Sequence, residues 1–332
     1  MLGYAVKLLT QPTDYQLTTA LNMTKFAFVF PGQGSQSRGM MNGYADFPAV
    51  RDTFAEASEV LKQDLWQLVA EGSDADLNAT VNTQPIMLAA GVAVYRAWQS
   101  QHGATPAMLA GHSLGEYTAL VAAGAIRFAD ALPLVRFRAQ CMQQAVPEGV
   151  GGIAAILGLD DDTVRAVCSE AAQGEVLEAV NYNSPAQVVI AGNRAAVERG
   201  MELAKAKGAK RAIMLPMSVP SHCQLLKGAA EQLRGYLADV AVQAPVIPVL
   251  HNADVAAYSD SAAIKDALVR QLYSPVRWVE TVLEFGKQGI THNVECAPGK
   301  VLAGLNKRID ANQQALAISD GEALKLVLAA LA

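Results

Sequence analysis

The chain has 332 residues, of which 52% are hydrophobic and 17% charged, and its formal net charge at pH 7 is −5. This length is sufficient for one large domain, or for a large domain with a smaller insert. The mildly acidic net charge and the absence of basic runs argue against nucleic acid as a partner. The sequence has no uncharged apolar stretch long enough to predict a membrane span.

The first 22 residues lack the charged start, apolar core and cleavage site of a signal peptide, and a sharper pattern begins at Met23. We expect residues 1–22 to form a poorly ordered tail. The four cysteines form no C-x-x-C pair and show no regular spacing, so neither a zinc site nor a disulfide framework is predicted. A reducing, cytoplasmic location fits this pattern.

Strands and helices alternate in the N-terminal part of the chain. The apolar run 25–30 predicts a buried strand that ends at a Pro-Gly-Gln-Gly loop, and this loop lacks the spacing of a dinucleotide-binding motif. Helices are predicted at 50–61, 65–71 and 84–101, and a second strand at 107–110. This alternation predicts an α/β core with a mostly parallel sheet, as in hydrolases.

A G-x-S-x-G turn centred on Ser113 joins that second strand to the next helix. Such a turn presents its serine at the top of a sheet, and the flanking glycines remove the Cβ atoms that would collide there. The backbone N–H of Leu114 would point to the position where an oxyanion could form. The sequence therefore predicts a nucleophile, and the alternative is a glycine-rich packing turn with an idle serine.

The next predicted helix, 128–144, carries Arg136 and Arg138, which point to different faces because they are two residues apart. One of them is expected at the surface, while the other can reach the cleft. Arg138 would be informative if the acyl group carried a carboxylate, because a guanidinium grips that group through two charge-assisted hydrogen bonds. From the residues alone, a surface role for Arg138 stays open.

The pattern changes after Gly149 and predicts a strand–helix–strand–strand–helix–strand order, at 151–159, 161–173, 176–183, 187–192, 194–208 and 211–217. This order is that of a ferredoxin-like unit. We therefore predict a small subdomain, 149–217, inserted into a large subdomain made of 23–148 and 218–332. Beyond it the sequence predicts helices at 225–237, 255–272 and 302–309, and strands at 246–250 and 292–296.

A serine hydroxyl needs a base to remove its proton, and the chain has five histidines. His222 follows two prolines in an irregular, accessible loop and is the preferred base. His112 is adjacent to the nucleophile and is expected to project elsewhere. The other three, His102, His251 and His292, are assigned structural roles. The sequence shows no aspartate that would orient the imidazole.

Seven collinear motifs give the chain a family resemblance. They are FVFPGQGSQ at 28–36, GHSLGEY at 111–117, R-x-x-x-M at 138–142, NYNSPAQVVIAG at 181–192, PSH at 220–222, RQLYSPVRW at 270–278 and PGKVL at 298–302. Together they resemble the malonyl-CoA:acyl carrier protein transacylases, enzymes of bacterial fatty acid synthesis that are akin to the acyltransferase domains of polyketide synthases. The match runs from about Met23 to the C-terminus.

The resemblance implies transfer of a malonyl group from malonyl-CoA to holo acyl carrier protein, with no metal and no cofactor, by a chain expected to be a monomer. The implied site consists of the nucleophile Ser113, the base His222, the carboxylate clamp Arg138 with Met142 in the same motif, the oxyanion donors Gln33 and Leu114, and the carbonyl of Gln271 that orients the imidazole. An orienting carbonyl would account for the absent aspartate.

Two positions depart from the family pattern. Ser221 stands where many malonyl-selective polyketide domains have a bulky aromatic residue, and His251-Asn252 stands where two asparagines are expected. Two other functions stay open at this stage. The same nucleophile could pass its acyl group to water, as in an esterase or thioesterase, or the fold could be kept by a binding module without catalysis.

Overall fold

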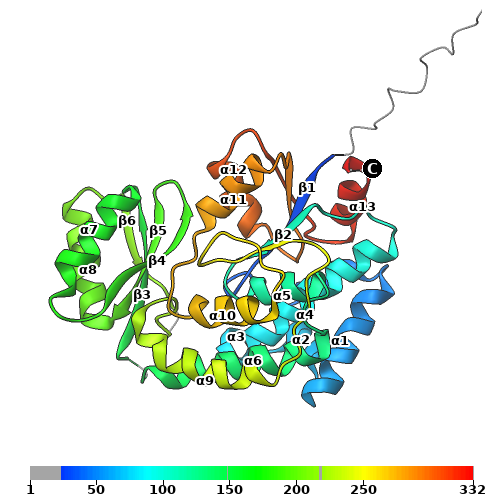
Figure 1. Cartoon of the computed structure of the whole chain (residues 1–332), viewed down its shortest axis with the longest axis horizontal. Coiled ribbons are helices and arrows are strands. Elements are labelled where there is room, and N and C mark those ends of the chain that lie inside the picture. Colours follow the sequence, from blue (N-terminus) through cyan, green and yellow to red (C-terminus); the bar gives the residue numbers. More distant parts are fainter. Residues whose placement is uncertain (1–23, 148, 217–218, 332) are drawn as a thin grey trace, which may run out of the picture.

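The structure, a computed structural model, describes residues 24–147, 149–216 and 219–331. The predicted tail at 1–22 lies outside the described residues. Two sheets organise the described part, and they lie side by side in Figure 1.

The larger sheet has five parallel strands in the order β7-β2-β1-β8-β9. Its strands are β1 (Phe26–Phe30), β2 (Met108–Gly111), β7 (Val249–Leu250), β8 (His292–Glu295) and β9 (Gln314–Ala317). The register pairs Phe30 with Gly111, so the loops that follow β1 and β2 leave the same edge of the sheet. This edge carries the G-x-S-x-G turn, and the predicted parallel α/β core is confirmed.

Two hydrophobic layers cover the larger sheet because side chains alternate along its central strand. Phe26, Phe28 and Phe30 face α1, α4 and α6, and the ring of Phe28 lies edge-on to Trp98 at 5.2 Å between centroids. Ala27 and Val29 face the opposite layer, built largely from α11 and α12. Burial on both faces explains why β1 is an unbroken apolar run.

The helices of the larger unit are α1 (Pro48–Leu61), α2 (Leu65–Glu71), α3 (Asp74–Asn78), α4 (Thr80–Ser100), α5 (Gly115–Ala122), α6 (Phe128–Ala145), α9 (Lys227–Ala238), α10 (Ser261–Gln271), α11 (Trp278–Lys287), α12 (Val301–Ile309) and α13 (Gly321–Ala330), with 3-10 turns at Asn42–Tyr44 and Gln224–Leu226. Figure 1 shows α4, α5 and α6 next to one another beneath the strands. Helix α4 is buried along most of its length and thus forms the centre of this layer.

The smaller sheet is antiparallel, in the order β4-β5-β3-β6. It comprises β3 (Gly151–Leu157), β4 (Leu177–Ser184), β5 (Gln187–Asn193) and β6 (Arg211–Met214), with α7 (Asp161–Ala172) and α8 (Arg194–Ala206) packed on one face. The predicted βαββαβ order is confirmed. The predicted subdomain boundaries stay a prediction, because residues 148, 217 and 218 lie outside the described residues.

Some predicted elements were wrong or absent. The helix predicted at 255–272 begins only at Ser261, because Val255 has a φ of +55° and the chain before Ser261 instead forms a bridge to β7. The strand predicted at 246–250 is limited to two residues. Helices α3, α11 and α13 and strand β9 were not predicted.

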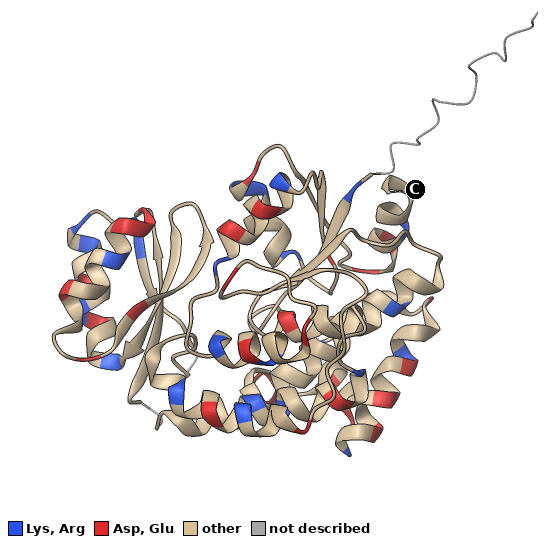
Figure 2. Cartoon of the chain, viewed as in Figure 1, with Lys and Arg blue, Asp and Glu red and all other residues tan. Residues whose placement is uncertain are grey.

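Charged side chains of both signs are interspersed along the outer helices in Figure 2. Across the described ranges, no helix combines the length and apolar character needed to cross a membrane. All four cysteines are buried and free, as expected for small hydrophobic side chains.

Candidate active site

The turn between β2 and α5 forces Ser113 into an uncommon backbone conformation, with a φ of +53°. Glycine is required on both sides. A Cβ at Gly111 would lie 1.8 Å from the carbonyl carbon of Gly115, and a Cβ at Gly115 would lie 2.0 Å from the carbonyl oxygen of Phe30. The close approach of strand and helix therefore depends on these glycines, and it leaves the serine at the edge of the sheet.

Two side chains from the C-terminal half hold the strained serine on both sides of its backbone. The N–H of Ser113 donates to Asn252 Oδ1 at 2.7 Å, and its carbonyl accepts from Gln271 Nε2 at 2.9 Å. Both residues are fully buried. A strained conformation persists when its surroundings over-determine it, and these two bonds do so here.

The predicted base lies at the nucleophile. The Oγ atom of Ser113 is 2.8 Å from His222 Nε2, and His222 Nδ1 is 2.7 Å from the main-chain oxygen of Gln271. A carbonyl oxygen can only accept, so the Nδ1 proton is fixed there and Nε2 is left to accept from the serine. The geometry suits proton removal from Ser113.

Burial, followed by the positive charge of Arg138, lowers the pKa of His222 to about 3. The hydrogen bond to the Gln271 carbonyl acts in the opposite direction. The imidazole is therefore neutral at physiological pH, which is the form that can take a proton.

Arg138 reaches the same hydroxyl from helix α6, and its exposed fraction is only 1%. Its guanidinium donates to Gln84 Oε1 at 2.8 Å, to Gln271 Oε1 at 2.9 Å and to Ser113 Oγ at 3.2 Å. Burial lowers its pKa, while Glu116 favours the charged form. The alternative of a surface arginine is excluded, and Arg136, two residues earlier, instead bonds to Leu61 and Gln63.

The loop after β1 packs directly on the turn that carries the serine. A Cβ at Gly32 would lie 2.5 Å from the carbonyl oxygen of His112 and 3.6 Å from the backbone nitrogen of Leu114. Gln33 follows Gly32, and both Gln33 and Leu114 line the pocket. Both residues that carry the predicted oxyanion donors therefore line the same pocket as Ser113, and their donor role stays a prediction.

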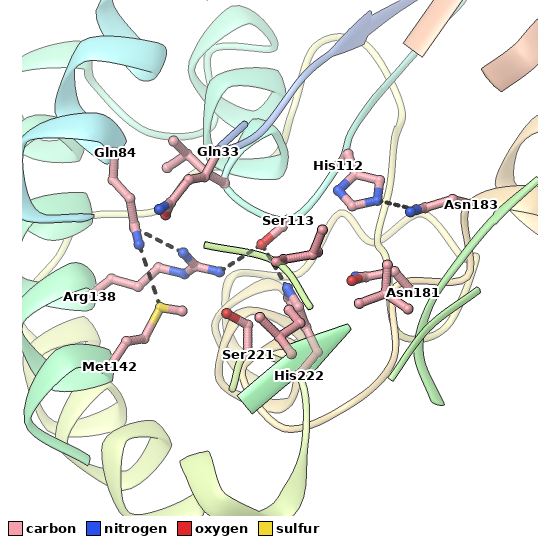
Figure 3. Close-up of a pocket in the computed structure, with 14 residues that line it drawn as sticks. Gln33, Gln84, His112, Ser113, Arg138, Met142, Asn181, Asn183, Ser221 and His222 are labelled. Carbon is pink, nitrogen blue, oxygen red and sulfur yellow. Dashed lines mark hydrogen bonds between the residues drawn. The ribbon is translucent and has the colours of Figure 1, made fainter. Parts of the chain in front are cut away.

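The opposite wall of the pocket includes a histidine whose orientation was predicted wrongly. His112 does not project elsewhere but lines the same pocket, with its Nε2 atom 2.8 Å from Asn183 Oδ1 on β4 (Figure 3). Asn181, Ile153 and Val189 come from the smaller sheet to the same wall. In a turn of this type the residue before the nucleophile therefore connects the two sheets.

The pocket beside Ser113 has a volume of about 150 Å³. Most of the predicted site residues line it, namely Gln33, Ser113, Leu114, Arg138, Met142 and His222. Figure 3 shows Arg138, Met142 and Gln84 on one side of Ser113 and His112 on the other. Gln271 is the remaining predicted residue, and it joins the site through its hydrogen bonds to Ser113, Arg138 and His222.

The sequence did not predict three residues that touch this constellation. Gln84 bonds to the guanidinium of Arg138 and contacts Met142 Sδ at 3.5 Å. Asn252 holds the serine, and Glu116 bonds to Gln271. Within the described ranges, no cluster of three or more His, Cys, Asp or Glu side chains could hold a metal ion.

Comparison with known proteins agrees with this geometry. The model of the acyl transferase domain family matches residues 27–323. A malonyl CoA-acyl carrier protein transacylase of Salmonella typhimurium is 55% identical over 307 residues, which cover 92% of this chain and 99% of the relative.

Two solved structures also match over their whole length. An acyl-carrier-protein S-malonyltransferase of Burkholderia pseudomallei is 63% identical with a TM-score of 0.91, and the match covers 92% of this chain and 100% of the other. A malonyl-transacylase in complex with its type II PKS acyl-carrier protein is 50% identical with a TM-score of 0.92 and the same coverage. The chain therefore belongs to the acyl transferase family, among the malonyl CoA-acyl carrier protein transacylases.

Proposed function

We propose that this acyltransferase moves the malonyl group of malonyl-CoA to the phosphopantetheine thiol of acyl carrier protein, through a malonyl ester of Ser113, and so supplies fatty acid synthesis. The observation that carries the proposal is the position of one hydroxyl. Ser113 Oγ lies within hydrogen-bond distance of both a neutral imidazole, His222, and a buried guanidinium, Arg138.

In the first half of the reaction, His222 Nε2 takes the hydroxyl proton while Ser113 Oγ attacks the thioester carbonyl. The backbone N–H groups of Gln33 and Leu114 would receive the resulting oxyanion, and removing a single such donor costs ~3 kcal/mol in known cases. The C–S bond then breaks, and the imidazolium returns its proton to the departing coenzyme A thiolate. The product of this half is the malonyl ester.

In the second half, the thiol of the carrier's pantetheine arm gives its proton to His222 and attacks the ester carbonyl. The C–O bond breaks, and the imidazolium protonates Ser113. The main-chain carbonyl of Gln271 holds Nδ1–H in both halves, so Nε2 faces the reacting atoms throughout. One histidine thus serves as base and then as acid in each half.

Arg138 suits a carboxylate at the far end of the acyl group. Its NH1 atom donates to Gln84 and its NH2 atom to Gln271, so each nitrogen keeps a second proton. The second NH2 proton points to Ser113 Oγ in the free protein and is released when that oxygen becomes an ester. That NH2 proton, with an N–H on NH1 or Nε that bonds to no described residue, would allow a bidentate grip on a carboxylate.

The small pocket supports a short acyl group. A volume of about 150 Å³ suits a short acyl group, and the apolar side chains of Met142 and Ile153 are among those that line it. A neutral acyl chain would leave the buried guanidinium without a charged partner, which is unfavourable. The malonyl group satisfies both the size and the charge of this pocket.

The experiment is intact-protein mass spectrometry after brief exposure to malonyl-CoA, without carrier protein. One malonyl increment is expected on the wild type and none on Ser113→Ala. Adding holo acyl carrier protein should remove the increment and place it on the carrier. A wild type that gains no increment would exclude the covalent route, and release of free malonate as fast as transfer would instead indicate a hydrolase.

We further propose that the chain acts as a monomer in the cytoplasm. In a single copy, Ser113 already lies within hydrogen-bond distance of His222 and Arg138, the other two groups that the proposed reaction uses. Light scattering at assay concentration tests this, and a stable dimer would contradict it.

A further inference from the structure

A buried carboxylate lies directly behind the nucleophile and takes no part in the reaction as described. Glu116 stands three residues after Ser113 in the first turn of α5, and it is fully buried. Its Oε1 atom accepts from His251 Nδ1 at 2.7 Å. Its Oε2 atom accepts from the backbone N–H of Asn252 and from Gln271 Nε2, both at 2.9 Å.

The contact with Gln271 links this carboxylate to the catalytic groups. The side-chain oxygen of Gln271 accepts from Arg138 at 2.9 Å, and its main-chain oxygen accepts from His222 at 2.7 Å. The same side chain donates to the carbonyl of Ser113. One residue therefore connects Glu116 to the clamp, the base and the nucleophile.

The contact with Asn252 adds a second link to the serine. Glu116 accepts the backbone N–H of Asn252, whose side chain accepts from Ser113 N at 2.7 Å and donates to Gly111 O at 2.6 Å. The carboxylate thus supports both residues that hold the strained turn.

An ionised carboxylate can only accept hydrogen bonds, so Glu116 holds the Gln271 amide in the same direction as the Ser113 carbonyl and the Arg138 guanidinium do. Gln271 must turn its NH2 group to Glu116, so its oxygen must face Arg138. The reverse orientation would place two donors against each other at Arg138 and two acceptors against each other at Glu116. With a neutral amide at position 116, the Ser113 carbonyl and the Arg138 guanidinium would still favour this orientation, but Gln271 would lose the charged acceptor that holds its NH2 group.

The charge of Glu116 has a second effect. The direct side-chain oxygen partners of the Arg138 guanidinium among the described residues, those of Gln84, Gln271 and Ser113, are neutral. A buried cation is costly without a compensating charge, and Glu116 lies one amide away from it. The negative charge of Glu116 therefore compensates the positive charge of Arg138 without bonding to it. The guanidinium stays free to bind the carboxylate of an acyl group.

We propose that Glu116 is a positioning residue of the acyl transfer, which holds the Gln271 amide in place and, through it, the geometry of Arg138. This inference rests on the proposed function of the site. No carboxylate bonds directly to Ser113 or His222 among the described residues, and Glu116 would instead act on both through Gln271.

The test compares Glu116→Gln with Glu295→Gln, measuring kcat/KM for Ser113 acylation by malonyl-CoA and by acetyl-CoA. Glu295 is an equally buried carboxylate that accepts from the start of α12 and does not line the pocket. We expect Glu116→Gln to lower the malonyl value on the order of tenfold or more and the acetyl value less, because a clamp displaced slightly loses much of its effect. Glu295→Gln should keep the wild-type ratio of the two donors.

A double variant separates positioning from general loss of structure. If Glu116 acts through Arg138, Glu116→Gln should not change the donor ratio further in an Arg138→Ala background. A wild-type ratio in Glu116→Gln, an equal change in Glu295→Gln, or independent effects in the double variant would each overturn the inference.

A second variant covers the case in which Glu116→Gln does not fold. Gln271→Met keeps the main-chain carbonyl that holds His222 but removes the amide between Glu116 and Arg138. It is expected to lower the same donor ratio, and an unchanged ratio would overturn the inference. Absence of any malonyl adduct on the wild type would be a failure of the proposed function instead, and the wild-type control in each series reveals it.

Discussion

Replacing Arg138 with alanine tests the carboxylate clamp directly. The guanidinium is almost completely buried and donates to Ser113 Oγ at 3.2 Å, and in the proposed function it gives two N–H groups to the malonyl carboxylate. Each hydrogen bond to a charged group contributes about 1.5–3 kcal/mol, so losing two weakens transition-state binding of the malonyl group by about 3–6 kcal/mol. At ~1.4 kcal/mol per tenfold change, kcat/KM for malonyl-CoA should fall about a hundredfold to ten-thousandfold.

Acetyl-CoA carries no such carboxylate, so its kcat/KM should stay near the wild-type value or rise. The assay is acylation of Ser113 by each donor, with both proteins checked by urea unfolding. Arg136→Ala is the matched control, since Arg136 lies on the same helix but bonds to Leu61 and Gln63 outside the pocket. Equal losses for both donors in Arg138→Ala, or the same selectivity change in Arg136→Ala, would refute the clamp.

Three further predictions concern a base, a glycine and an amide. Because the pKa of His222 is lowered to about 3, this base stays neutral near pH 6.5, and kcat/KM for acylation should not fall as the pH drops through that value. Because the unfolded chain protonates this histidine below about pH 6.5, folding stability should decline by up to ~1.4 kcal/mol per pH unit as pH falls from there towards 3, and less steeply in His222→Gln. Gly115→Ala, whose Cβ would lie 2.0 Å from the Phe30 oxygen, should lose about 3 kcal/mol of unfolding free energy in urea. Gln84→Leu removes one of the amide partners of the clamp and should lower kcat/KM for malonyl-CoA about tenfold, with a smaller loss for acetyl-CoA.

Each of these three has a result that would contradict it. An acid limb of kcat/KM at pH 6.5, or identical pH slopes of stability in wild type and His222→Gln, would show that the histidine titrates normally. Gly304→Ala serves as the glycine control, because a Cβ there meets nothing within 4 Å, and it should be neutral or slightly stabilising. A wild-type preference for malonyl-CoA over acetyl-CoA in Gln84→Leu would mean that the Arg138 guanidinium does not depend on its hydrogen bond to Gln84.

The sequence could predict the parts of the site that local patterns encode. Gly111 and Gly115 indicate the tight turn around Ser113, because a side chain at either position would collide with neighbouring backbone. The alternating pattern after Gly149 indicates the βαββαβ order. The supporting residues could not be predicted in this way. Gln84 and Glu116 lie within helices, where a polar residue carries no signal that it faces a buried cation rather than solvent.

The wrong predictions have a similar physical origin. The orientation of His112 depends on Asn183, a partner on a different sheet. The start of α10 was predicted too early, because the apolar residues before Ser261 bridge to β7 rather than continue a helix. Short-range periodicity does not report such contacts between distant segments.

The two amides that secure the serine backbone have a consequence for biosynthesis. Asn252 and Gln271 are translated more than a hundred residues after Ser113, and β1 reaches its neighbour β8 only when residue 292 has been made. A nascent chain that ends before residue 271 therefore carries the nucleophile without the contacts that hold it in its strained pose or orient its base. We therefore expect a partly synthesised chain to react poorly with thioesters until residue 271 has been made.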